Sequence, residues 1–142
     1  MLRPVAPLAD VAPLLLALLG RTVPAGFPSP ADDYLEGEID LARLLVERPA
    51  ASFVMRVSGH SMSGAGILDG DLLVVDRSVA ARPGHVVVAT LDGEMTIKRL
   101  RRLRDGRMAL KAEHPDYPEL IICEEAPAEV WGVVVGVVRK LA

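Results

Sequence analysis

The amino-acid sequence predicts a mainly β domain, a small and strongly curved sheet or barrel, preceded by an extended N-terminal arm. From Ser52 onward, short runs rich in Val, Ile and Leu are separated by turns that contain Gly or Asp, which is typical of an all-β domain. Six or seven such runs within about 90 residues indicate a curved sheet or barrel. Because 51% of the residues are hydrophobic and only 4% are aromatic, Val, Leu and Ala have to build the core.

The arm is predicted from its prolines. Residues 1–38 contain six of them, and each fixes φ and lacks a backbone N–H, so long helices and central strands are not expected there. A short helix is predicted from Asp40 to Glu47, with Asp40 as its N-cap and Pro49 beyond its end. We therefore divide the chain into an arm, residues 1–38, and a β domain, residues 39–142.

Hydrophobic runs bounded by turn residues predict seven strands in the domain. They cover residues 53–58, 71–76, 85–91, 94–103, 107–112, 120–123 and 131–139. Asp92-Gly93 and Asp105-Gly106 favour tight hairpin turns, which join the third strand to the fourth and the fourth to the fifth. The run from Val133 to Val138 is apolar on both faces, so we expect a homodimer in which a subunit contact covers this strand.

Charge, cysteine content and the length of the apolar runs exclude several classes of protein. The net charge of −3 argues against a protein that coats nucleic acid, and direct DNA binding is not expected. A single cysteine, Cys123, excludes an internal disulfide and a cysteine-based zinc cluster, which favours the cytoplasm. The longest apolar runs have nine residues, about half of the roughly 20 needed to cross a bilayer.

Ser61 is the first candidate for chemistry. It follows a predicted strand in Gly59-His60-Ser61-Met62, where the glycine lets the backbone turn sharply. Such a turn can aim a hydroxyl and neighbouring N–H groups in the same direction, as a nucleophile beside an oxyanion site requires. Gly-x-Ser is also common in ordinary turns, so this motif alone leaves a purely structural role open.

Lys98 is the second candidate. Alternation along its strand places it on the same face as Thr96 and Leu100, with Met95 and Ile97 on the other face, and leaves open which face is buried. A lysine becomes a useful base only if desolvation lowers its pKa by roughly 2–3 units, and Ser–Lys pairs are a known solution for acyl transfer. The alternative is a surface lysine whose charged end reaches the solvent.

Four segments together resemble a known family. They are Gly59-His60-Ser61-Met62, Gly64-Ala65-Gly66-Ile67-Leu68-Asp69-Gly70-Asp71, Gly84-His85-Val86-Val87-Val88-Ala89 and Gly93-Glu94-Met95-Thr96-Ile97-Lys98-Arg99-Leu100. They resemble the self-cleaving serine peptidase domain of the LexA/UmuD (S24) family, from about Val23 to the C-terminus. The resemblance implies a LexA/signal-peptidase-like fold, Ser61 as nucleophile, Lys98 as general base, and the N–H groups of His60 and Ser61 as oxyanion site. No cofactor and no metal are expected.

The resemblance also implies a cleavage site and partners. Family members are cut before a glycine in the arm, which corresponds to Ala25-Gly26 here. Only 25 residues precede Gly26, too few for the helix-turn-helix domain of the repressors, so the arm looks like that of the UmuD-type members. Such a protein is expected to cleave itself in the SOS response, when a RecA filament on single-stranded DNA stimulates it. The processed form is expected to serve an error-prone, UmuC-like translesion polymerase as accessory subunit.

One position departs from the family pattern. Family members usually have Asp where this chain has His60, and a base role for His60 is disfavoured because adjacent side chains on extended backbone diverge. A binding module with a vestigial Ser-Lys pair, a signal-peptidase-like enzyme and a repressor-like member stay open as alternatives. Asp69, Asp71 and Asp76 fit turn chemistry better than a metal site, and the basic run 98–104 fits a solvated strand face better than a DNA contact.

Overall fold

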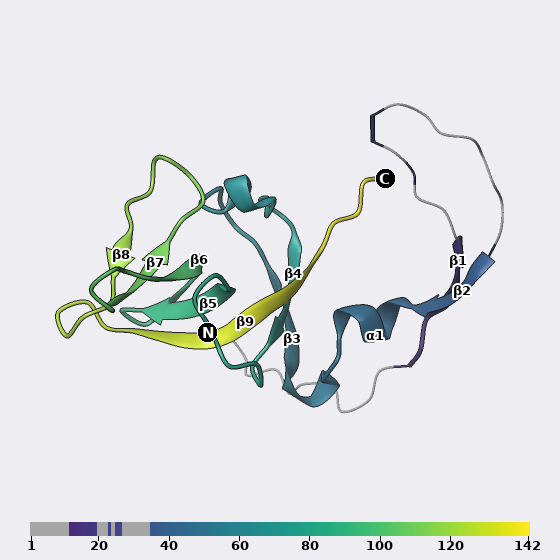
Figure 1. Ribbon diagram of the computed structural model, residues 1–142, viewed down its shortest axis with the longest axis horizontal. Coiled ribbons are helices and arrows are strands. Elements are labelled where there is room, and N and C mark those ends of the chain that lie inside the picture. Colours follow the sequence, from purple (N-terminus) through teal and green to yellow (C-terminus); the bar gives the residue numbers. More distant parts are fainter. Residues whose placement is uncertain (1–11, 20–22, 24, 27–34) are drawn as a thin grey trace.

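The computed structural model describes residues 12–19, 23, 25–26 and 35–142 of the chain (Figure 1). Of the six prolines that predict the arm, only Pro13 lies within these residues. No helix in the described part of the chain is long and apolar enough to span a membrane.

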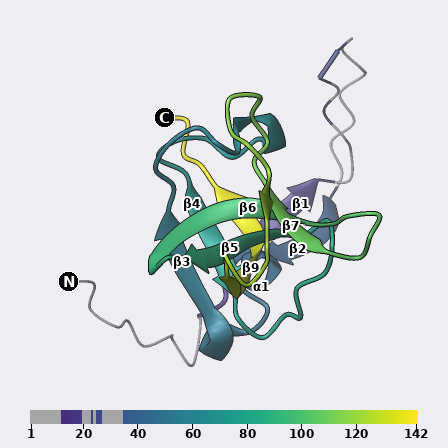
Figure 2. The same cartoon turned by 90° about the vertical axis from the view of Figure 1, so that its left-hand side faces the viewer.

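A seven-stranded antiparallel sheet forms the body of the molecule, so the mainly β prediction is confirmed. The strand order is β3-β4-β9-β5-β6-β7-β8. The strands are β3 (Ser52–Arg56), β4 (Leu72–Asp76), β5 (Val86–Leu91), β6 (Glu94–Arg102), β7 (Met108–Lys111), β8 (Leu120–Ile121) and β9 (Ala128–Val138). Each begins and ends within three residues of its predicted bounds. Because β3 and β8 are the two ends of this order, the sheet is open, and of the two predicted forms it is the curved sheet that is found (Figure 2).

The last strand, β9, is central to the sheet. It pairs with β4 on one edge and with β5 on the other, and the register shifts once along each pairing. Such irregularities bend a strand and increase its twist, which is consistent with the curvature of the sheet. Gly132 lies beside Val133, which pairs with Asp76 of β4, and a Cβ there would lie 2.6 Å from Val75 Cγ1, so only glycine allows this close approach.

Two hydrophobic clusters fill the body. One contains Met62, Leu73 and Val88, and the other contains Val87 and Leu110, all of them buried. Aliphatic side chains dominate both clusters, as the composition predicts. Consecutive residues Val87 and Val88 belong to different clusters, because side chains alternate between the two faces of a strand.

The described part of the arm forms a hairpin that the sequence did not predict. β1 (Leu15–Leu19) pairs antiparallel with β2 (Leu35–Asp40) in a separate two-stranded sheet, which lies beside α1 and apart from the main sheet (Figure 1). The strand β1 falls in the proline-free stretch after Pro13, so the prolines do not prevent its pairing. Its leucines remain 39–57% exposed.

Asp40 connects the hairpin to the body. It is the N-cap of α1 (Leu41–Leu45), as predicted, and its carboxylate accepts hydrogen bonds from the N–H groups of Ala42 and Arg43. The same carboxylate oxygen accepts from Leu14 N–H at 3.0 Å, just before β1. These hydrogen bonds hold the pKa of Asp40 below its ordinary value, and the largest contribution comes from Leu14. A short 3-10 helix, η1 (Pro49–Ala51), then leads into β3.

Candidate active site

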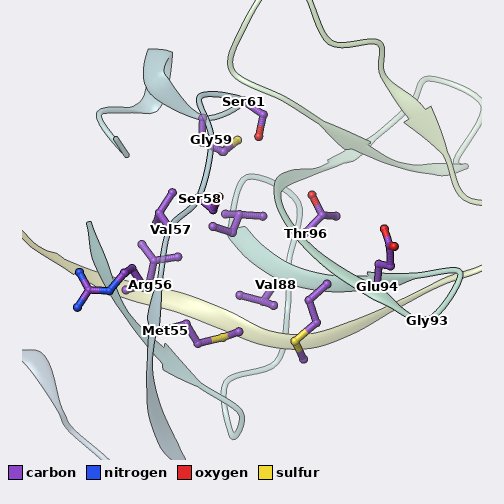
Figure 3. A pocket seen from close by; sticks show the side chains of 14 residues that line it. Met55, Arg56, Val57, Ser58, Gly59, Ser61, Val88, Gly93, Glu94 and Thr96 are labelled. Carbon is purple, nitrogen blue, oxygen red and sulfur yellow. The ribbon is translucent and has the colours of Figure 1, made fainter. Parts of the chain in front are cut away.

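A pocket of about 500 Å³ opens between the end of β3 and the beginning of β6 (Figure 3). Its walls are residues 55–59, Ser61 and Met62 on one side and residues 93–97 on the other, with Leu73 and Val88 also lining it. The lining is mostly apolar, and the hydroxyl of Ser61 and the carboxylate of Glu94 are among its few polar groups (Figure 3). A mostly apolar lining with a few polar groups is typical of ligand pockets.

The loop that carries Ser61, residues 57–66, is held by several independent contacts; we call it the Ser61 loop. Gly59 has a φ of +96°, which favours glycine, and its N–H donates to Asp69 Oδ1 at 2.8 Å. Met62, next to Ser61, is 2% exposed and anchors the loop in the core. The loop ends in the short 3-10 helix η2 (Ser63–Ala65). These contacts fix Ser61 at the wall of the pocket.

Glu113, just beyond β7, holds the Ser61 loop from the other side. Its N–H donates to the carbonyl of Ser61 at 2.8 Å, and its carbonyl accepts from the N–H of Gly64 at 2.9 Å. Its carboxylate accepts from Arg99 Nε at 2.6 Å, and Arg99 also donates to the carbonyl of Gly84. We call this set of contacts the Glu113 latch. It joins the Ser61 loop to β6, the strand that carries Lys98.

The structure brings Lys98 and Ser61 together. Lys98 Nζ lies 3.2 Å from Ser61 Oγ, 3.0 Å from Thr96 Oγ1 and 3.2 Å from the carbonyl oxygen of Ile97. Partial burial desolvates the ammonium group and lowers the pKa of Lys98 from its ordinary value. The centroid of the Tyr117 ring lies 5.8 Å from Nζ. Thr96 and Tyr117 were not singled out from the sequence as members of the site; only the Thr-x-Lys alternation signalled Thr96.

The backbone near Ser61 supplies candidate oxyanion donors. Among the described residues, no protein group accepts a hydrogen bond from the N–H of His60 or of Ser61. The side chain of His60 is exposed, and within the described chain it is Lys98, not His60, that lies within hydrogen-bond distance of Ser61 Oγ. The arrangement therefore combines a hydroxyl, an amine of lowered pKa and two available N–H groups. An acyl-transfer reaction requires these three kinds of group as nucleophile, general base and oxyanion donors.

Ala25 and Gly26 do not occupy the pocket. Both are exposed, they form a bend, and neither is among the residues that line the pocket. The structure therefore shows the arm with this peptide bond outside the site.

The three aspartates considered for a metal site have other partners. Asp71 accepts two hydrogen bonds from Arg139, which hold its pKa below the ordinary value, and Arg139 also donates to the carbonyl of Gly66. Asp76 accepts from Ser78 and Arg48, and Asp69 accepts from Gly59. Within the described ranges no group of three or more His, Cys, Asp or Glu residues is arranged to hold a metal ion.

The basic run around Lys98 is partly paired. Arg99 forms an ion pair with Glu113, and Arg101 with Glu119. Arg99 and Arg101 therefore have ion-pair partners within the protein itself.

Comparison with known proteins adds a family and several relatives. The family model described as Peptidase S24-like matches residues 17–135. Protein ImpA of Salmonella typhimurium is 46% identical over 122 residues, which cover 82% of this chain and 78% of that protein. Protein SamA of Salmonella typhimurium strain LT2 is 42% identical over 134 residues, or 94% of this chain and 89% of that protein. The LexA repressor of Delftia acidovorans is 42% identical over 135 residues, and the match covers 58% of its length.

Proposed function

The chain belongs to the peptidase S24-like family, and on this basis we propose that it is a serine endopeptidase that cuts its own arm between Ala25 and Gly26. Ser61 is the nucleophile and Lys98 the general base. The observation that carries this proposal is the 3.2 Å contact between Ser61 Oγ and a partly desolvated Lys98 Nζ at the wall of an apolar pocket.

The proposed reaction follows from this geometry. Neutral Lys98 takes the proton of Ser61 as Oγ attacks the carbonyl carbon of Ala25, and the resulting oxyanion accepts hydrogen bonds from the N–H groups of His60 and Ser61. When the intermediate collapses, the bond between Ala25 and Gly26 breaks, and the new amine of Gly26 takes the proton from Lys98. Water then hydrolyses the ester on Ser61. Throughout, Thr96 Oγ1 orients Lys98 Nζ toward the nucleophile.

The substrate is tethered to the enzyme, so cleavage is controlled by whether the arm enters the pocket. The exposed position of Ala25 and Gly26, outside the pocket, supports a resting state that waits for a stimulus. By its likeness to the UmuD-type members of the family, we infer that the stimulus is a RecA filament on single-stranded DNA. The processed chain, Gly26 to Ala142, then acts in the cytoplasm as a homodimeric accessory subunit of an error-prone, UmuC-like polymerase in SOS mutagenesis.

Intact mass spectrometry tests the proposed chemistry. The purified chain is incubated at about pH 10, where more of Lys98 is neutral, and in parallel with an activated RecA filament. We expect two fragments that meet between Ala25 and Gly26. Ser61→Ala and Lys98→Ala should stay intact, whereas Ser63→Ala and Lys111→Ala, neighbours outside the proposed machinery, should be cut like the parent chain.

A chain that stays whole under both conditions would favour the alternative of a binding module with a vestigial Ser-Lys pair. His60→Asp is then the informative variant, because His60 is the position that departs from the family pattern. Cleavage that persists in Ser61→Ala would contradict the proposed nucleophile.

A further inference from the structure

The strand β6 has an unpaired edge beside the pocket. Its residues Glu94 to Arg99 pair with β5 on one edge, whereas on the other edge β7 pairs only with Arg99 to Arg102. In the described part of the chain, residues 94–98 therefore have no strand on the edge opposite β5. Residues 93–97 also line the pocket, across from the Ser61 loop. The pocket is thus a groove along a free strand edge, to which an extended peptide can add as another strand.

The direction of such a peptide follows from the position of the reacting groups. Lys98, which contacts Ser61, lies at one end of the free edge, and Glu94 lies at the other. With the carbonyl of Ala25 at Ser61, the residues before Ala25 would run parallel to β6. The residues after Gly26 are poorer candidates for this edge, because Pro28 and Pro30 both lack an N–H.

Equal spacing along the two strands then places Arg21 beside Glu94. Arg21 precedes Ala25 by four residues, and Glu94 precedes Lys98 by four residues. Since extended strands advance by the same distance per residue, a strand with Ala25 beside Lys98 has Arg21 beside Glu94. Arg21, Val23 and Ala25 would also share one face. In this arrangement the backbone nitrogen of Pro24 faces away from β6, so no hydrogen bond to β6 is lost through its missing N–H.

The charge of Glu94 suits this neighbour. Its side chain is exposed at the rim of the pocket, and among the described residues it has no ion pair (Figure 3). We propose that residues 21–25 bind as a parallel strand on the free edge of β6, and that Glu94 selects this segment through the guanidinium group of Arg21. This proposal rests on the proposed self-cleavage and names a specificity-determining residue for it.

Charge exchange tests the pair in the full chain. We expect Glu94→Arg and Arg21→Glu each to slow cleavage about fivefold, the size of effect that an exposed ion pair can have. The double variant should return to within about twofold of the parent rate, since opposite charges face each other again. Glu125→Arg, which reverses an exposed carboxylate outside the pocket, is the matched control and should cut at the parent rate. A double variant as slow as the product of the two single effects would overturn the pairing.

Disulfide trapping tests the same contact without any cleavage. In a chain with Ser61→Ala and Cys123→Ser, we introduce Arg21→Cys together with Glu94→Cys, and as a control Arg21→Cys together with Glu125→Cys. Under mild oxidation the disulfide between positions 21 and 94 should form at least about fivefold faster than the control, within one chain or between two. Equal rates would overturn the proposal even if the parent chain never cuts itself. If the disulfide between positions 21 and 94 forms selectively but the parent chain never cuts itself, the proposed binding of residues 21–25 to β6 is supported and the proposed peptidase activity is rejected.

Discussion

The Ser61 loop and the β1–β2 hairpin are held to the body in very different ways. The loop is fixed from three directions, by Asp69, by the buried side chain of Met62 and by the Glu113 latch. The hairpin is a two-stranded sheet with exposed leucines on β1, and Asp40 links it to α1. A two-stranded hairpin alone is marginally stable in water. The comparison indicates that the site is assembled in advance, whereas the arm, which is the proposed substrate, is held to the body by few contacts.

The largest effect should come from replacing the proposed base. Lys98→Arg keeps the positive charge and the length but cannot lose its proton in the accessible pH range. We expect self-cleavage to fall by about 10³-fold or more at every pH, in line with the usual contribution of a general base. Intact mass spectrometry over time gives the rate, and Lys111→Arg, on the exposed end of β7, serves as control. A rate that recovers above pH 10 would contradict the assignment.

The next largest effect should come from the Glu113 latch. A Cβ at Gly64 would lie 2.6 Å from the carbonyl oxygen of Glu113, so Gly64→Ala has to push the Ser61 loop away from Glu113. A displacement of about 1 Å can cost about 100-fold in rate, and we expect a loss of that order. Ser63→Ala is the control within the same loop. Wild-type cleavage by Gly64→Ala would mean that preassembly of the loop is unimportant.

The pH dependence of cleavage tests how much the burial of Lys98 contributes to the site. Burial lowers the pKa of Lys98, so the neutral, reactive form is favoured at a lower pH than for an exposed lysine. Below that pKa the rate should rise about tenfold per pH unit, and it should level off above it. A plateau that begins only at the pKa of an exposed lysine, about 10.4, would show that desolvation contributes nothing. The profile is measured by mass spectrometry between pH 6 and about 11.

The smallest effect is expected at the hairpin. Asp40→Ala removes both the side-chain cap of α1 and the acceptor for the hydrogen bond from Leu14, which should free the arm and raise the rate of cleavage about two- to fivefold. Because the pKa of Asp40 is lowered in the folded chain, its stabilising contacts are present above the carboxyl's ordinary pKa and lost as the pH falls through the lowered value. Hydrogen exchange at Leu14 and Leu15 reports the release, with Glu47→Gln as control. Unchanged exchange would show that Asp40 does not hold the hairpin.

The sequence predicted the strands, and it singled out Ser61 and Lys98, which the structure brings within 3.2 Å of each other. Strand alternation and Gly or Asp turns are local signals, and Ser61 and Lys98 stand in motifs that carry the family resemblance. The buried face around Lys98 could not be predicted, because alternation fits both faces equally. In the structure the face of Lys98 carries Thr96, which contacts it, and the buried Leu100.

Other features have no local signal at all. In the Glu113 latch, both contacts with the Ser61 loop are backbone hydrogen bonds between segments far apart in the chain, and backbone groups are the same in every residue. The pairing of β1 with β2 depends on a partner strand that lies many residues further along the chain. The prolines restrict only their own backbone conformation and that of the residue directly before each of them. The sheet is open because its end strands, β3 and β8, do not pair with each other in the described chain, and composition does not specify which strands pair.

The ion pair between Asp71 and Arg139 has a consequence for timing during protein synthesis. Arg139 follows β9, and it is the side chain that holds Asp71 and the carbonyl of Gly66 at the end of the Ser61 loop. β9 itself is the central strand that joins β4 to β5. A nascent chain on the ribosome therefore lacks both the middle of its sheet and this support until β9 and Arg139 have emerged from the exit tunnel. We expect the proposed cleavage to be impossible before that point, so that synthesis of the chain up to β9 leaves the arm intact.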